Sequence, residues 1–252
     1  MEKEFDILKA NYHTVKNQSY DFAVLPWGAT EPHNYHLPYL TDCYLAHDIS
    51  LKAVEKAYDN YKIRGMVLPP IPLGSQNPGQ RELPFCLHAR YETQRAILGD
   101  IVESLHYQGI HTLVIVNGHG GNSFKNMVRD LAVDYPEMRI AVSDFFTIVP
   151  QSGYFEEKDD HAGEMETSLL LYFRPHLVDM SVAGNGTYKP FKSQALREGV
   201  AWMPRDWSKV SEDTGIGNPL KSTAEKGERY AEAVVDKLAL LFEELAKENI
   251  YG

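Results

Sequence analysis

The sequence has few cysteines and no long apolar run, and each absence excludes a class of protein. Its two cysteines, Cys43 and Cys86, lack the paired spacing of a thiolate zinc site, so we expect inert thiols in a reducing compartment. No apolar run approaches the roughly 18 residues of a transmembrane helix, so no membrane span is predicted. The first residues contain no apolar core, so no signal peptide is predicted and a cytoplasmic location is expected.

Basic residues are scarce relative to acidic ones. Lys and Arg number 25 against 35 Asp and Glu, which gives a formal net charge of −10. Nucleic acids and anionic membranes select basic surfaces, so neither is expected as a partner. The overall charge does not determine the charge of a cleft, and a small-molecule substrate therefore stays open.

Short apolar runs alternate with amphipathic stretches along the chain. The expected strands are 21–26, 66–68, 112–116 and 139–143, and the expected helices are 43–58, 93–107, 123–134, 163–173 and 223–248. The five-residue apolar run 112–116 is typical of a strand buried on both faces of a parallel sheet. The alternation predicts an α/β protein with a layered, mostly parallel sheet, and we expect residues 1–252 to form a single domain.

Metal-binding residue types are concentrated in segment 27–42, which follows the first expected strand. It contains Glu31, His33, His36 and Asp42. Residues two apart in an extended segment point the same way, so Glu31 and His33 can approach one metal or two adjacent ones. Open α/β sheets place their sites at the carboxyl ends of strands, where this segment is expected to lie.

A second candidate is the glycine-rich segment 117–122, which follows the most apolar strand and contains His119. Its three glycines allow a tight turn and close backbone approach to a ligand. The histidine would then lie at the same edge of the sheet as Glu31 and Asp42. An anion-binding turn at a helix N-terminus is the alternative interpretation.

The third candidate, segment 161–168, opens an expected helix and contains His161, Glu164 and Glu166. A solvated acidic helix start would explain the two glutamates, because the helix dipole favours them there. Three leucines follow at once, however, so this helix is expected to be buried. A buried carboxylate needs a partner, and a cation would serve. By contrast, segment 214–227 holds no obvious ligand and is predicted to be a structural loop that caps the last helix.

Taken together, these segments resemble the creatininase family. The family pattern Glu-x-His-x-x-His-Leu-Pro, followed by Thr-Asp, matches residues 31–38 and 41–42. Its Asn-Gly-His-Gly-Gly-Asn loop matches 117–122, and its His-Ala-Gly-x-x-Glu-Thr-Ser run matches 161–168. A closing Gly-Ile-x-Asn-Pro … Ala-Glu-Lys-Gly pattern matches 215–227, so the resemblance extends over nearly the whole chain.

The resemblance implies a three-layer α/β/α sandwich with two divalent metal ions per chain, which zinc, manganese or iron would suit. It also implies a homo-oligomer, with a hexamer as the expected form. By position it assigns metal ligation to Glu31, His33, Asp42 and His119, with Asp42 as the bridge. Some members carry a ligand glutamate where this chain has Gly121, so Glu166 is the candidate that completes the second metal. His161 would be the acid/base group.

The positions that contact substrate differ more from the family pattern. Glu157 and Gly120 stand where creatininase carries aromatic residues, and the run 154–160 is acidic. Segment 69–91 is long and irregular, and such loops often form binding edges. We therefore expect Ser75 and His88, together with Gly120 and Glu157, to contact the substrate.

The leading hypothesis is a metal-dependent amidohydrolase that cleaves a non-peptide C–N bond in a small cyclic amide or formamide. The altered contact positions argue against creatinine as the substrate. A peptidase or a sugar-ring hydrolase could use the same metals, and a binding module without catalysis is the rival from another class.

Overall fold

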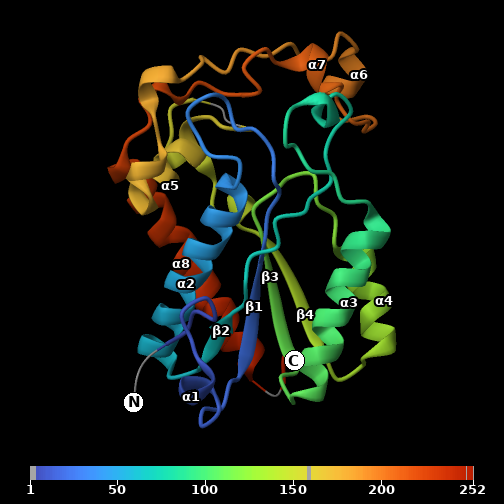
Figure 1. Ribbon diagram of the computed structural model, residues 1–252, viewed down its shortest axis with the longest axis vertical. Coiled ribbons are helices and arrows are strands. Elements are labelled where there is room, and N and C mark those ends of the chain that lie inside the picture. Colours follow the sequence, from blue (N-terminus) through green and yellow to red (C-terminus); the bar gives the residue numbers. More distant parts are fainter. Residues whose placement is uncertain (1–3, 158–159, 248, 252) are drawn as a thin grey trace.

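The computed structural model describes residues 4–157, 160–247 and 249–251. Its centre is a four-stranded, all-parallel sheet with strand order β2-β1-β3-β4 (Figure 1). The strands are β1 (Phe22–Trp27), β2 (Gly65–Val67), β3 (Thr112–Asn117) and β4 (Arg139–Asp144). Each lies within one or two residues of its predicted position.

Helices cover both faces of the sheet (Figure 1). One layer consists of α2 (Thr41–Tyr61), α5 (Glu164–Phe173) and α8 (Ala224–Ala246), and the other of α3 (Tyr91–Tyr107) and α4 (Lys125–Asp134). The short helices α1 (Tyr12–Val15), α6 (Gln194–Arg197) and α7 (Trp207–Val210) lie outside these layers. The predicted three-layer α/β/α sandwich is confirmed. The helix predicted over 223–248 ends at Ala246, and Glu248 lies outside the described residues.

Strand β3 shows why its sequence is a continuous apolar run. Val114 and Val116 pack against α2, α5 and α8, whereas Leu113 and Ile115 pack against α3 and α4. Alternate side chains along a strand point to opposite faces, so a strand covered on both sides needs apolar residues at every position. No helix among the described residues combines the length and the apolarity of a membrane crossing. Both cysteines are free thiols.

The strand register brings three loops together at one edge of the sheet. Trp27 at the end of β1 pairs with Asn117 at the end of β3, and the amide of Gly118 donates to the carbonyl of Trp27 (2.8 Å). Trp27 also forms a parallel bridge with Ile71, in the chain that leaves β2. The segments after β1, β2 and β3 therefore start side by side at the carboxyl edge.

The contact between α5 and α8 explains the closing sequence pattern 224–227. Thr223 caps α8 by accepting a hydrogen bond from the amide of Lys226, as expected for a helix-capping segment. The Lys226 ammonium pairs with the fully buried carboxylate of Glu164 on α5 (2.5 Å). Gly227 faces the backbone carbonyl of Ser168, and a Cβ there would overlap that oxygen. The pattern fixes the helix that carries Glu166.

Gly227→Ala should therefore lower the free energy of unfolding by about 1–3 kcal/mol, because the α5–α8 backbones must separate to admit the methyl group. The matched control is Gly99→Ala in α3, where a new Cβ meets only a Leu131 methyl carbon at 4.0 Å. That change should raise the stability by about 0.5–1 kcal/mol, because alanine is the better helix former. Urea unfolding of both variants measures the two effects, and equal changes of the same sign would contradict this account.

Candidate metal centre

Glu31 and Asp42, which both follow β1, meet His119, which follows β3. The Nδ1 atom of His119 lies 2.9 Å from Oε1 of Glu31 and 3.2 Å from Oδ2 of Asp42. All three side chains are buried, at 1–6% exposure. Asp42 is held in place because it belongs to the first turn of α2, where the helix dipole also favours a carboxylate.

The second oxygen of Asp42 faces a second histidine. Its Oδ1 lies 2.9 Å from Nε2 of His33. Glu166, on the first turn of α5, has a carboxylate oxygen close enough to share one ion with His33 and Asp42. Asp42 thus stands between two imidazoles, with one oxygen toward each, which is the geometry of a carboxylate that could bridge two cations.

Backbone carbonyls fix the orientation of the histidine rings. His33 has Nδ1 at 3.0 Å from the Glu31 carbonyl, and His119 has Nε2 at 2.8 Å from the Ser75 carbonyl. A carbonyl only accepts, so each of these nitrogens must carry the hydrogen. In a neutral ring the other nitrogen then presents its lone pair to a carboxylate. Two acceptors face each other at both contacts, and only a proton or a metal cation between them relieves the repulsion.

The pKa values show the same demand for positive charge. Burial would lower the pKa of His33, but the carboxylates of Asp42, Glu166 and Glu31 together outweigh burial and raise it to about 10. His119 has its pKa raised well above the ordinary value, because Glu31 and Asp42 outweigh its burial. Burial would raise the pKa of Glu31 and of Asp42, but the neighbouring histidines lower both instead.

The donor set fits divalent cations. Oε1 of Glu31 and Oδ2 of Asp42 are buried, and both face Nδ1 of His119. Among the described residues, three overlapping groups could each hold one ion: Glu31 with Asp42 and His119, His33 with Asp42 and Glu166, and Glu31 with His33 and His161. Buried carboxylate oxygens need a positive charge beside them, and a coordinated metal supplies one. Mixed imidazole and carboxylate donors suit zinc or manganese.

His161 reaches this cluster from the chain before α5. Its backbone forms an antiparallel bridge with Ile216. The next residue, Ala162, adopts a left-handed conformation (φ 53°), and its backbone amide donates a hydrogen bond to Oε2 of Glu166 (2.6 Å). His161 has Nε2 at 3.0 Å from the Pro32 carbonyl, which leaves Nδ1 facing Oε1 of Glu31 at 3.7 Å. Burial, with the charge of His33, lowers the pKa of His161. The ring is therefore neutral near pH 7.

Two other residues of the matched motifs have different partners. Nε2 of His36 contacts the Thr167 hydroxyl (2.8 Å), and burial lowers the pKa of His36 to about 4. Lys226 is the cation that pairs with one carboxylate oxygen of Glu164. The other oxygen of Glu164 accepts hydrogen bonds from the backbone amides of Glu156 and Glu157. His36 and Glu164 thus orient the segments that carry His33 and Glu166.

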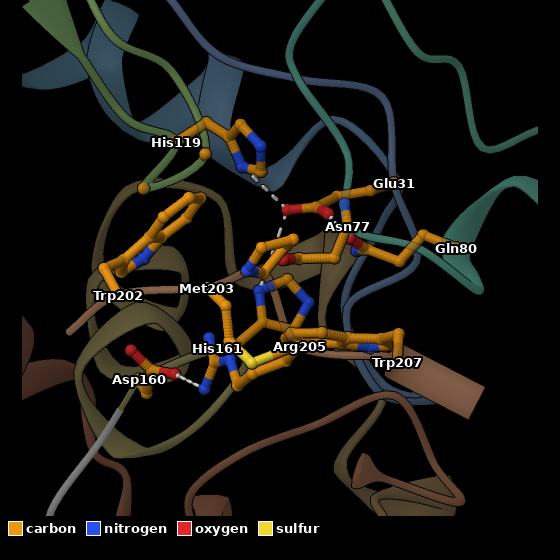
Figure 2. A pocket seen from close by; sticks show the side chains of 13 residues that line it. Glu31, Asn77, Gln80, His119, Asp160, His161, Trp202, Met203, Arg205 and Trp207 are labelled. Carbon is orange, nitrogen blue, oxygen red and sulfur yellow. Dashed lines mark hydrogen bonds and ion pairs between the residues drawn. The ribbon is translucent and has the colours of Figure 1, made fainter. Parts of the chain in front are cut away.

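A cavity of about 160 Å³ opens onto this cluster. Glu31, His119 and His161 form part of its wall, and Gly120 lines it without filling it. Figure 2 shows His119 and Glu31 at one end and the Asp160–Arg205 pair at the other, with Trp202 and Trp207 on different sides. A second, narrower cavity of about 110 Å³ reaches Asp42, Met165 and Glu166. The candidate ligands are therefore accessible to a small molecule.

The four residues expected at the substrate lie in different places. Gly120 lines the larger cavity. Ser75 is not among the lining residues, and its carbonyl instead orients the ring of His119. His88 is exposed and lies outside the lining, and its Nδ1 accepts a hydrogen bond from the backbone amide of Gln76 (2.9 Å). Glu157 is also outside the lining and pairs with Lys221 (3.2 Å); its neighbours in the acidic run, 158–159, lie outside the described residues.

Sequence reasoning missed several residues of the cavity wall. Gln80, at the start of the 3-10 turn η1 (Gln80–Glu82), donates through Nε2 to Oε2 of Glu31 (2.6 Å). Oε1 of Gln80 accepts a hydrogen bond from the backbone amide of Asn77 (2.7 Å), so the orientation of the Gln80 side-chain amide is fixed. Trp202, Arg205 and Trp207 come from the irregular segment 180–220. The one sequence signal for a role in the cavity wall is that these large side chains occur in an otherwise polar segment.

Comparison with known proteins agrees with this geometry. The creatininase family profile, described as creatinine amidohydrolase, matches residues 9–242. A Bacteroides fragilis NCTC 9343 protein that carries the provisional name creatinine amidohydrolase has a crystal structure with 56% sequence identity and a TM-score of 0.98, and the match covers 100% of both chains.

Two further relatives differ in their described activities. The mycofactocin precursor peptide peptidase of Mycolicibacterium smegmatis is 32% identical over 84% of this chain and 80% of its own length. A mutant creatininase has been solved in a zinc–zinc form, and creatininase in a manganese form. Each shows 23% identity, a TM-score of 0.76, and coverage of 96% of this chain and 98% of that one. At that identity the creatininase structures establish the shared fold.

The raised pKa values of His33 and His119 predict that metal binding releases protons. In the metal-free protein both rings are protonated near pH 7, so a metal must displace a proton from each. The apparent zinc affinity should rise with pH between 6 and 8, with a slope of about two in log K per pH unit. Competition with a chromophoric chelator measures it. A pH-independent affinity would show that the rings are already neutral.

Proposed function

The chain belongs to the creatininase family of hydrolases, and we propose that it is a metal-dependent amidohydrolase that cleaves a non-peptide C–N bond in a small cyclic amide or formamide. The observation that carries this proposal is that Glu31 and His119 belong both to the buried donor set and to the cavity wall. A donor set closed to solvent would serve structure alone. One that opens onto a cavity can act on a substrate.

In this proposal Glu31, Asp42 and His119 hold one divalent cation, and His33, Asp42 and Glu166 hold the other. Zinc and manganese are favoured because creatininase is known in both forms. Bound there, such cations would polarise the scissile carbonyl and lower the pKa of the attacking water. The side chain of Gln80 keeps Glu31 in place by occupying Oε2, which leaves Oε1 for a cation.

His161 transfers the proton. Its Nε2 is engaged by the Pro32 carbonyl, so Nδ1 is the nitrogen free to act, and it lies on the cavity side near Glu31. Because its pKa is lowered, the ring starts neutral and can accept a proton from the attacking water. The resulting imidazolium can donate that proton to the departing nitrogen, which completes hydrolysis.

A peptidase is the second candidate, because the peptidase from M. smegmatis is 32% identical to this chain. The cavity argues for a smaller substrate, since about 160 Å³ is below the roughly 300–1,000 Å³ of typical ligand pockets. The sugar-ring hydrolase and the non-catalytic binding module have no comparable support.

A substrate screen distinguishes these candidates. Protein reconstituted with zinc or manganese is assayed on cyclic amides, formamides, creatinine and short peptides, with metal content measured on the same sample. Turnover of a cyclic amide or a formamide supports the proposal. Turnover of peptides alone identifies a peptidase, and metal binding without any turnover identifies a binding module.

His161→Ala should lower kcat by about 10²- to 10⁴-fold while leaving the metal content unchanged, because the residue moves protons and holds no cation. His176→Ala is the matched control, since His176 is exposed on the 3-10 turn η4 (Pro175–Leu177). It should leave both quantities unchanged. Parallel loss of metal and turnover in His161→Ala would make His161 a ligand.

A further inference from the structure

Arg205 is a charged residue of the cavity wall that the metal-binding proposal does not use. Among the described lining residues it is the only lysine or arginine. It lies at the end of the cavity opposite His119 and Glu31 (Figure 2). A molecule whose amide lies at the candidate metal ligands would extend toward this guanidinium.

The position of Arg205 is fixed by two contacts. Its Nη1 donates to Oδ2 of Asp160 (2.5 Å), and its guanidinium carbon lies 5.0 Å from the centre of the Trp207 ring. Trp207 is buried, and its ring packs edge-on against His161 at 5.4 Å. The guanidinium is thus preorganised beside the proposed proton-transfer residue, and its remaining N–H groups have no hydrogen-bond partner within the described part of the chain.

The described acidic residues of the run 154–160 all have cationic partners. Glu156 and Glu157 pair with Lys221, and Glu156 also pairs with Lys226. Asp160 is engaged by Arg205. At the other end, three carboxylates would face the four positive charges of two divalent cations, so the loaded cavity favours an anion over a cation.

We propose that Arg205 binds a carboxylate of the substrate, so that the substrate is a small amide with a free carboxylate group. A guanidinium offers paired N–H groups that match a carboxylate, and one engaged by Asp160 at a single nitrogen retains such a pair. Trp202 and Trp207 flank the space between the two ends of the cavity. The amide part of this inference rests on the proposed function; the carboxylate site does not.

The test uses two probes that share one ring and differ at a single group, the carboxylate of 5-oxoproline and the uncharged carboxamide of 5-oxoprolinamide. Both are five-membered cyclic amides, and their dissociation constants are measured by titration calorimetry on the zinc-loaded protein. The wild type should bind the carboxylate at least about tenfold more tightly, as expected for a charge-assisted hydrogen bond. Arg205→Gln should abolish this preference, and Arg205→Lys should keep part of it.

Lys209→Gln is the matched control, because Lys209 is a nearby cation that is exposed, pairs with Asp206 and lies outside the cavity lining. It should retain the full preference. Equal affinities in the wild type, no measurable affinity for the carboxylate, or a preference that survives in Arg205→Gln would overturn the proposal. Turnover is measured separately. A carboxylate preference without hydrolysis of any amide would support the carboxylate site at Arg205 and contradict the proposed amidohydrolase activity.

Discussion

The structure depends on the meeting of imidazole lone pairs and carboxylate oxygens in a buried space. Backbone carbonyls take the N–H of His33 and of His119, so the free ring nitrogens point at Asp42 and Glu31. Such contacts repel unless a positive charge lies between them, and burial removes the water that could screen them. The fold therefore creates a place for cations before any substrate arrives.

The sheet makes this meeting possible. Parallel strands end at one edge, and the register of β1 with β3 starts the Glu31 and His119 loops side by side. The helical layers then fix the other contributors, since α2 begins with Asp42 and α5 with Glu166. The contact of Lys226 with Glu164 anchors α5 against α8. Stability and the candidate site thus share the same elements.

Much of this could be predicted from the sequence, because the relevant signals are local. The apolar run of β3 predicted a strand covered on both faces, and the alternation of elements predicted the layered fold. The candidate ligands Glu31, His33, Asp42 and His119 lie in short motifs whose residue types are those of metal ligands. Their convergence followed from the position of each motif after a strand.

The cavity wall was harder to predict because its contacts join distant parts of the chain. Gln80 reaches Glu31 across a long irregular loop, and Arg205 reaches Asp160 from a segment without periodicity. Nothing in the local sequence distinguishes such residues from solvated loop residues. The acidic run 154–160 illustrates the reverse case: Glu157 was expected at the substrate, but its carboxylate faces Lys221, which only the fold reveals.

Anomalous diffraction from crystals grown with zinc, recorded at the zinc absorption edge, shows whether the buried cluster binds two cations. We expect two peaks in the buried cluster, one bound by Glu31 and His119 and the other by His33 and Glu166. Asp42 should lie between them, with ligand distances of about 2.0–2.2 Å. A single peak, or peaks only at surface histidines, would contradict this expectation.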